Sequence, residues 1–379
     1  MSLGKKGSLN LSTNAIVMLI LAIVVLGLGL AFMRNIFGQA TGDFTEIGGE
    51  VQKQIITQMK SSSKVVDLSG AVYKIKPGEK KMVYIGFKNT GNEPKKFIIK
   101  GVNVNSISGG EDNCGMYDEN LILQYKQKAT TVQPGATSVL PINIKANSNA
   151  EKDSCFYELL IEETDNSLVG YWNFNIEDDA TDLSGNNNDG VLVSDPTWTK
   201  VDTKPGLGGA YDFDGTNYIS LDSIPALTGN TVTISAWVQI SSYEGSYETV
   251  LTQYGPGYNG YYLFSDLLFK KPSLWVSPTD NQAVSTEALP ANEWHHIAGT
   301  YDDQTIKIYV DGTMQGSKEA SGLIGVDHNA YIGYDDIENQ YFNGLIDEVH
   351  VFDRALSPSE VMNLHSGYDH SIQLTVNVE

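Results

Sequence analysis

The fold is decided by the stretch Phe342-Asn-Gly-Leu-Ile-Asp-Glu-Val-His-Val-Phe-Asp-Arg-Ala-Leu-Ser357, in which apolar and polar residues alternate. Such alternation is typical of a strand that has one face in a core. The same pattern recurs through residues 168–367, and the Asp-Gly pairs at 189–190, 214–215 and 311–312 indicate tight turns between strands. We therefore expect a large unit made almost entirely of β-strands.

Further landmarks precede this stretch in a fixed order. They are Val169-Gly-Tyr-Trp-Asn-Phe174, Asp182-Leu-Ser-Gly-Asn-Asn-Asn-Asp-Gly190, Gly208-Gly-Ala-Tyr-Asp-Phe-Asp-Gly215, Thr233-Ile-Ser-Ala-Trp-Val238, Trp294-His-His-Ile-Ala-Gly-Thr-Tyr301, Ile308-Tyr-Val-Asp-Gly312 and Tyr331-Ile-Gly333. Taken together, they resemble the laminin-G-like, concanavalin A-like lectin/glucanase module over residues 167–367. The resemblance implies a jelly roll of two curved antiparallel sheets.

A second pattern of short strands occupies residues 65–166, with turn signals at Pro77-Gly78 and Pro134-Gly135. It resembles the immunoglobulin-like β-sandwich of prokaryotic surface proteins. After Gly367, alternating apolar residues from Ile372 to Val378 predict one isolated final strand. A lone strand needs a sheet to join, so we expect residues 368–379 to complete the sandwich and the lectin-like module to be inserted into it.

The N-terminal region is of a different kind. Residues 8–33 carry no charged side chain, which exceeds the roughly 20 apolar residues that span a bilayer as a helix. One interpretation is a membrane anchor with its N-terminus inside. The other is based on Lys5-Lys6-Gly7-Ser8, which resembles the class III leader (residues 1–7) of archaeal type IV pilin-like proteins. That resemblance implies a prepilin peptidase that cuts between Gly7 and Ser8, and a hydrophobic helix and stalk over residues 8–64.

Charge and cysteine content limit the partners and the compartment. The formal net charge is −21, and residues 168–367 contain 28 Asp and Glu against 7 Lys and Arg. This balance disfavours nucleic acid as a partner. The only cysteines, Cys114 and Cys155, are expected to form one disulfide in an exported protein. Two unrelated buried thiols are the alternative.

Candidate metal ligands gather in an oxygen-rich loop, since Ca²⁺ binds carboxylates, amides and carbonyls. The lectin-like resemblance implies a structural calcium near the Asp-x-Ser-Gly-Asn loop and the Ile-Asp-Glu strand. Carried over by position, the ligands are Asp182, Asn188 and Asp347, with Asn175 and Asp179 as further candidates. A solvated, turn-forming Asn/Asp loop is the alternative.

Candidate ligand-binding residues are Tyr254, Tyr258 and Tyr261, in a glycine-rich aromatic stretch whose rings can stack on sugars. Packing at the rim of the sheet is the alternative. Catalysis is not expected, because Asp347 and Glu348 are adjacent on a strand and should point to opposite faces. The Glu-x-Asp-x-Glu hydrolase signature of the family is also absent.

The fold class expected from the sequence is mainly β with a long N-terminal α-helix, an immunoglobulin-like sandwich being interrupted by a concanavalin A-like jelly roll. The expected function is a structural subunit of an extracellular type IV pilus-like filament, a homo-oligomer packed through its N-terminal helices and displaying an adhesive lectin-like head. Such a subunit is inserted in the cytoplasmic membrane before assembly. The alternative is a membrane-anchored cell-surface protein that binds carbohydrate or protein and never polymerises.

Overall fold

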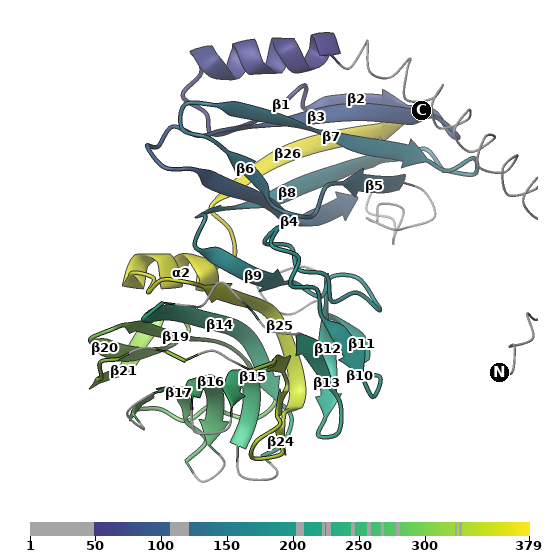
Figure 1. Cartoon of the computed structure of the whole chain (residues 1–379). Coiled ribbons are helices and arrows are strands. Elements are labelled where there is room, and N and C mark those ends of the chain that lie inside the picture. Colours follow the sequence, from purple (N-terminus) through teal and green to yellow (C-terminus); the bar gives the residue numbers. More distant parts are fainter. Residues whose placement is uncertain are drawn as a thin grey trace, which may run out of the picture.

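A computed structural model describes residues 49–106, 121–201, 208–221, 224, 229–243, 247–255, 259–266, 269–277, 281–322, 324–325 and 328–379. Two β-units lie one above the other, a first sandwich and a jelly roll (Figure 1). The chain passes from the first sandwich into the jelly roll and returns to the sandwich for its last strand.

The first sandwich consists of a four-stranded and a five-stranded sheet. In order across the first sheet, the strands are β1 (Val66–Leu68), β3 (Lys80–Lys88), β7 (Thr137–Ala146) and β5 (Leu121–Tyr125). Across the second sheet they are β2 (Val72–Ile75), β26 (His370–Val378), β8 (Ser154–Asp165), β4 (Lys95–Ser106) and β6 (Thr130–Val132). The inner faces share one apolar core, in which the rings of Phe87 and Phe97 stack at 5.1 Å.

The final strand lies inside this second sheet. β26 pairs antiparallel with β8, with Leu374 opposite Tyr157, and parallel with β2 on its other side. Leu374, Val376 and Val378 are buried in the sandwich core, as their alternation in the sequence requires. The jelly roll is therefore inserted between two neighbouring strands, β8 and β26.

The jelly roll consists of an eight-stranded and a seven-stranded sheet with a second core between them. The eight-stranded sheet runs β11 (Thr197–Val201), β12 (Gly208–Asp214), β25 (Asn343–Phe352), β14 (Thr231–Ile240), β19 (Trp294–Asp302), β20 (Thr305–Val310) and β21 (Thr313–Glu319), with β9 (Leu168–Trp172) also on β25. The seven-stranded sheet runs β10 (Val191–Val193), β13 (Tyr218–Leu221), β22 (Ala330–Ile332), β15 (Tyr247–Gly255), β16 (Asn259–Asp266), β17 (Pro272–Val276) and β18 (Asn281–Val284). A small hairpin pairs β23 (Tyr334–Asp335) with β24 (Gln340–Tyr341).

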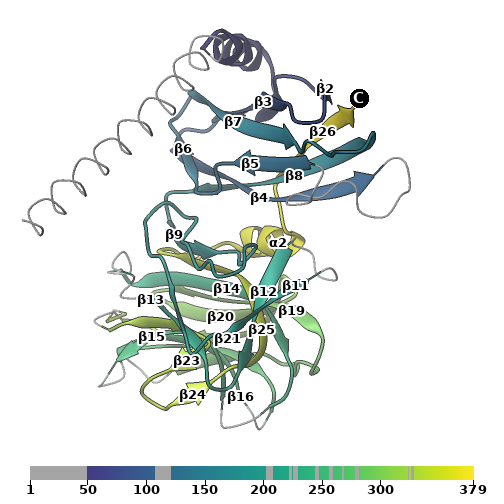
Figure 2. The same ribbon diagram turned by 90° about the vertical axis from the view of Figure 1, so that its right-hand side faces the viewer.

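The two jelly-roll sheets differ in what covers their outward faces. The helix α2 (Pro358–Ser366) lies on the eight-stranded sheet, where Val361 and Leu364 join an apolar cluster with Ala298 and Tyr309. Ile98 of the first sandwich belongs to the same cluster. Figures 1 and 2 both place β14 between the first sandwich and β15–β16, so the seven-stranded sheet faces away from the sandwich.

The expected fold class is wrong in its helical part. Within the described residues only the segment 49–61 and the nine-residue α2 are α-helical, and the protein there is nearly all β. Neither of these two helices has the length and hydrophobicity of a membrane-spanning segment. Residues 1–48, which include Gly7, Ser8 and the uncharged run, lie outside the described residues.

The segment 49–61 is not a free stalk. Its apolar stripe packs flat on the outward face of the four-stranded sheet, where Ile55 and Met59 are buried against Tyr84. Gly86 makes this approach possible, because a Cβ atom there would lie 2.2 Å from Sδ of Met59. The ammonium of Lys88 donates to the carbonyl oxygens of Met59 and Ser62 and so caps the helix end.

Candidate functional site

The loop predicted to bind calcium is held together by its own hydrogen bonds. Asp182 is fully buried, and its Oδ1 accepts from the backbone N–H groups of Tyr171 and Ser184. Its Oδ2 accepts from the Ser184 hydroxyl and from the backbone N–H of Asn188 at 3.0 Å. A carboxylate offers about four lone-pair sites, so this arrangement leaves Asp182 little capacity for a metal.

The other predicted ligands also have structural contacts. Asp179 accepts from the backbone N–H of Thr181, and Asn175 donates from Nδ2 to the carbonyl of Lys100 at 2.9 Å. Asp347 lies on β25, where its Oδ1 accepts from the backbone N–H of Glu348. The structure thus brings Asp182 and Asn188 together. In the described ranges no three His, Cys, Asp or Glu side chains form a metal-binding group, and calcium stays a prediction.

Two of the predicted ligand-binding tyrosines, Tyr254 and Tyr261, are buried. Tyr261 is fully buried in the jelly-roll core, and its hydroxyl donates to Oε1 of Gln253 at 2.7 Å. Tyr254 belongs to a buried aromatic cluster on the outward face of the seven-stranded sheet, where it meets Trp275 edge-on. Tyr258 lies outside the described residues. For Tyr254 and Tyr261, packing accounts for the contacts.

A different set of aromatic rings is accessible on this sheet. Four half-exposed tyrosines, which we call the tyrosine platform, are Tyr218, Tyr331, Tyr334 and Tyr341. The rings of Tyr218 and Tyr334 stack at 4.5 Å, and those of Tyr334 and Tyr341 also lie 4.5 Å apart. Tyr331 meets Tyr334 edge-on at 5.5 Å. The platform is therefore one continuous patch of ring surface.

Strand register explains how the platform forms. Ile219 pairs with Ile332 and both point into the core, so the preceding residues Tyr218 and Tyr331 point outward. Tyr334 and Tyr341 are directly opposite each other in the hairpin β23–β24, which lies against β15. Figures 1 and 2 place this hairpin at the end of the molecule far from the first sandwich.

Polar groups border the platform. Oδ2 of Asp336 lies 2.9 Å from Nε2 of His328 and 3.5 Å from the hydroxyl of Tyr331. The hydroxyl of Tyr334 donates to Oδ1 of Asn339. Burial raises the pKa of Tyr334 to about 12, so this phenol is a neutral hydrogen-bonding group at physiological pH. Ring faces and hydrogen-bonding groups thus occur side by side.

The sequence did not indicate this platform, because its members come from β13, β22 and a separate hairpin. The dense run Tyr331-Ile-Gly-Tyr334 with Tyr341 was a signal, but it does not reveal which ring faces are accessible. That information is contained in the pairing of β13 with β22.

The paired acids at 347–348 do not lie on a regular strand. Glu348 has a positive φ of 53°, and the register between β14 and β25 shifts at this point, which marks a β-bulge. Because of the bulge, adjacent side chains need not point to opposite faces here. Glu348 instead points to the first sandwich, where its Oε2 lies 2.7 Å from Nζ of Lys100 and accepts from the Tyr171 hydroxyl at 3.0 Å.

Lys100 and Glu348 belong to a buried group of charges between the two units. Nζ of Lys100 lies 3.1 Å from Oε2 of Glu162, and Nε2 of His350 lies 3.2 Å from the same oxygen. Burial raises the pKa of Glu162, but the charges of Lys100 and His350 outweigh it and lower the pKa to about 2. These carboxylates thus form ion pairs that join the two units.

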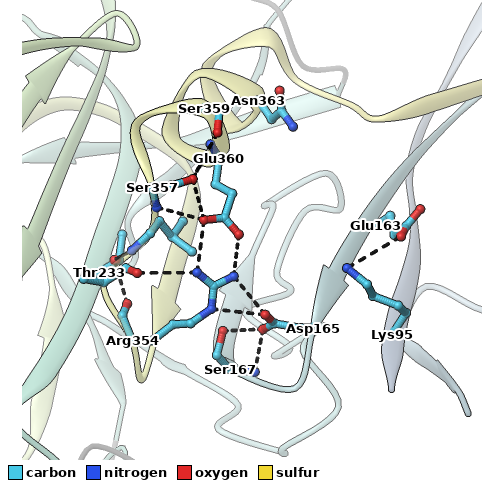
Figure 3. A network of polar contacts seen from close by, with 12 residues as sticks. Lys95, Glu163, Asp165, Ser167, Thr233, Arg354, Ser357, Ser359, Glu360 and Asn363 are labelled. Atoms are coloured by element: carbon cyan, nitrogen blue, oxygen red, sulfur yellow. Dashed lines mark hydrogen bonds and ion pairs between the residues drawn. The ribbon is translucent and has the colours of Figure 1, made fainter. Parts of the chain in front are cut away.

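A second polar network joins the units beside α2 (Figure 3). The guanidinium of Arg354 donates to Oδ2 of Asp165, at the end of β8, and to both carboxylate oxygens of Glu360 in α2. Glu360 and Ser357 also form the capping box of the helix. The adjoining cavity has a volume of about 70 Å³, room for a few waters but not for a sugar ring.

The cysteine pairing stays a prediction. Cys155 is fully buried in the core of the first sandwich, while Cys114 lies outside the described residues.

Residues 213–362 match the model of the family described as the concanavalin A-like lectin/glucanases superfamily. This match confirms the lectin-like resemblance for that part of the chain. No curated protein gives a significant match.

Solved structures with a similar fold include domain 4 of AbnA, an extracellular arabinanase from Geobacillus stearothermophilus in complex with arabinotriose. It is 23% identical, the match covers 52% of this chain and 98% of that chain, and the TM-score is 0.43. A Bacteroides ovatus protein described as carbohydrate-binding is 14% identical, with coverage of 81% and 86% and a TM-score of 0.36. The binding domain of botulinum neurotoxin serotype D is 15% identical, with coverage of 53% and 51% and a TM-score of 0.42. Likenesses at this level carry no argument about a ligand.

Proposed function

We propose that this chain is a non-enzymatic cell-surface protein whose jelly roll binds a saccharide on the tyrosine platform. The observation that carries the proposal is the platform itself, four half-exposed rings gathered on the outward face of a lectin-like sheet. Contiguous aromatic patches on a protein surface mark interaction sites. Sugar rings offer apolar C–H faces and many hydroxyls, and tyrosine offers a ring face and a hydroxyl.

One feature favours binding over hydrolysis, and a second leaves the platform open to a glycan. Glu348 is buried and paired with Lys100, and its neighbour Asp347 is also buried, so neither acid lies on the accessible platform. The platform lies on the sheet that faces away from the first sandwich, where a large glycan meets no obstacle from that unit (Figure 1).

The cell-surface location is proposed from composition and chemistry. The chain is strongly acidic, and the disulfide predicted between Cys114 and Cys155 suits an oxidising environment outside the cytoplasm. The filament and prepilin peptidase interpretations depend on residues 1–48. The family match does not reach that segment, so they remain predictions from the sequence.

A glycan array probed with the full chain tests this proposal, with one arm in excess calcium and one in EDTA. We expect saccharides to be bound in both arms, because the platform contains no predicted calcium ligand. Tyr334→Ala should abolish the signal, since Tyr334 contacts each of the other three rings. Absence of binding to any glycan in either arm would overturn the proposal.

A further inference from the structure

Acidic side chains border the tyrosine platform. Asp336 borders the platform, since its Oδ2 lies 3.5 Å from the hydroxyl of Tyr331. Glu338 is exposed at the tip of the hairpin β23–β24. Asp335 lies in the hairpin itself and is fully buried, with its Oδ1 accepting from the backbone N–H of Ile337. Three acidic side chains therefore stand within one short turn beside the rings.

Some of these acidic oxygens have no partner. Oδ2 of Asp335 and Oδ1 of Asp336 are both enclosed and make no hydrogen bond. Burial raises the pKa of Asp335, as expected for a carboxyl group without a compensating cation. The local field at the platform is therefore set by acids that no neighbouring Lys or Arg among the described residues neutralises.

The sequence explains this lack of cations. No Lys or Arg occurs between residues 205 and 269, or between residues 319 and 353. These two stretches build β12, β13, β15, β16 and β22–β25, which include every strand that carries a tyrosine of the platform. His328 is the only basic side chain that contacts the platform's acids in the described structure, and it lies against Asp336.

We infer that the tyrosine platform accepts saccharides without anionic groups, that is neutral sugars and amino sugars, and rejects sulfated, sialylated and uronate-containing ones. This inference rests on the proposed function and names the ligand class of the same site. An anionic group placed on the platform comes within a Debye length of Asp336 and Glu338 and meets repulsion instead of an ion pair. Specificity then arises from a repulsive element as well as from stacking.

The test compares matched ligands on the full chain. The tightest neutral hit of the glycan array is titrated beside two derivatives of itself, one carrying a sulfate and one an amino group at the same position. We expect the sulfated derivative to bind at least about tenfold more weakly than the neutral parent glycan at low salt. This difference in affinity should decrease as salt is added, because salt screens the repulsion. The amino derivative should bind as tightly as the parent or more tightly.

A charge variant makes the test specific to this site. Glu338→Gln should raise the affinity for the sulfated derivative relative to the neutral parent, whereas Glu319→Gln, an exposed acid on the other sheet, should leave that ratio unchanged. A sulfated derivative that binds as tightly as the parent, or hits that are mostly anionic, would overturn the inference while the proposed function stands. An array without any hit would overturn both.

Discussion

The ammonium nitrogen of Lys100, on β4 of the first sandwich, lies 2.7 Å from Oε2 of Glu348, on β25 of the jelly roll. Both side chains are buried, and Glu162 and His350 complete the group. Charges removed from water are tolerated only when they are paired, so this contact stabilises one arrangement of the two units. The inserted jelly roll is thus held by ion pairs across the interface as well as by the two chain connections.

Breaking this pair from one side should be costly. Lys100→Met leaves Glu162 and Glu348 buried without their common cation, and we expect a loss of about 3–5 kcal/mol in the free energy of unfolding. Urea denaturation of the full chain measures the loss. Lys74→Met removes the exposed contact with Glu379 and should have no measurable effect. Equal stability of the two variants would contradict the structural role of Lys100.

Acid should weaken the interface in a defined window. The pKa of Glu162 is about 2 in the folded protein, below its ordinary value of 4.5. A lowered folded pKa contributes stability that is present above pH 4.5 and is lost as the pH falls towards 2. We expect Glu162→Gln to lose less stability than the parent over this window, measured as the urea midpoint against pH. A parallel loss in both proteins would show that Glu162 does not contribute.

The contact between His370 and Glu163 should give the opposite pH dependence. Nε2 of His370 lies 2.8 Å from Oε2 of Glu163, and this hydrogen bond raises the pKa of His370 above 6.5. Its stabilisation is therefore full below pH 6.5 and is lost as the pH rises through the raised value. The melting temperatures of the parent and His370→Gln should converge across that range. If the difference in melting temperature between the two proteins does not change with pH, protonation of His370 does not contribute to stability in this range.

The docked helix segment 49–61 gives a further prediction. Met59 is fully buried against the sheet, so Met59→Ala should cost about 2–5 kcal/mol of stability. Thr57→Ala, on the exposed side of the same helix, is the matched control and should change stability little. If urea denaturation gives the same result for both variants, the segment is not packed on the sandwich in solution.

The sequence predicted those features that depend on local pattern. The Asp311-Gly312 pair predicted a tight turn, and both residues have positive φ between β20 and β21. The alternation from Ile372 to Val378 predicted a strand, and β26 lies in the second sheet of the sandwich. Such signals are complete within a few residues, so they can be read without knowledge of the partner strand.

Features that depend on distant partners were not predictable in the same way. The bulge at Glu348 interrupts the period of two, and Lys100, its partner, lies far away in the sequence. The docking of Met59 depends on Gly86 in another strand, where the absence of a side chain provides the space. The platform, likewise, exists only because Ile219 pairs with Ile332.

Isothermal titration calorimetry with the tightest glycan of the array measures whether the tyrosine platform is the saccharide-binding site. The parent chain, Tyr334→Ala and Tyr368→Ala are titrated side by side, since Tyr368 is an exposed tyrosine outside the platform. We expect Tyr334→Ala to lose binding heat while its melting temperature stays near that of the parent, and Tyr368→Ala to bind like the parent. Equal affinity of all three proteins would show that the saccharide binds elsewhere and would contradict the account.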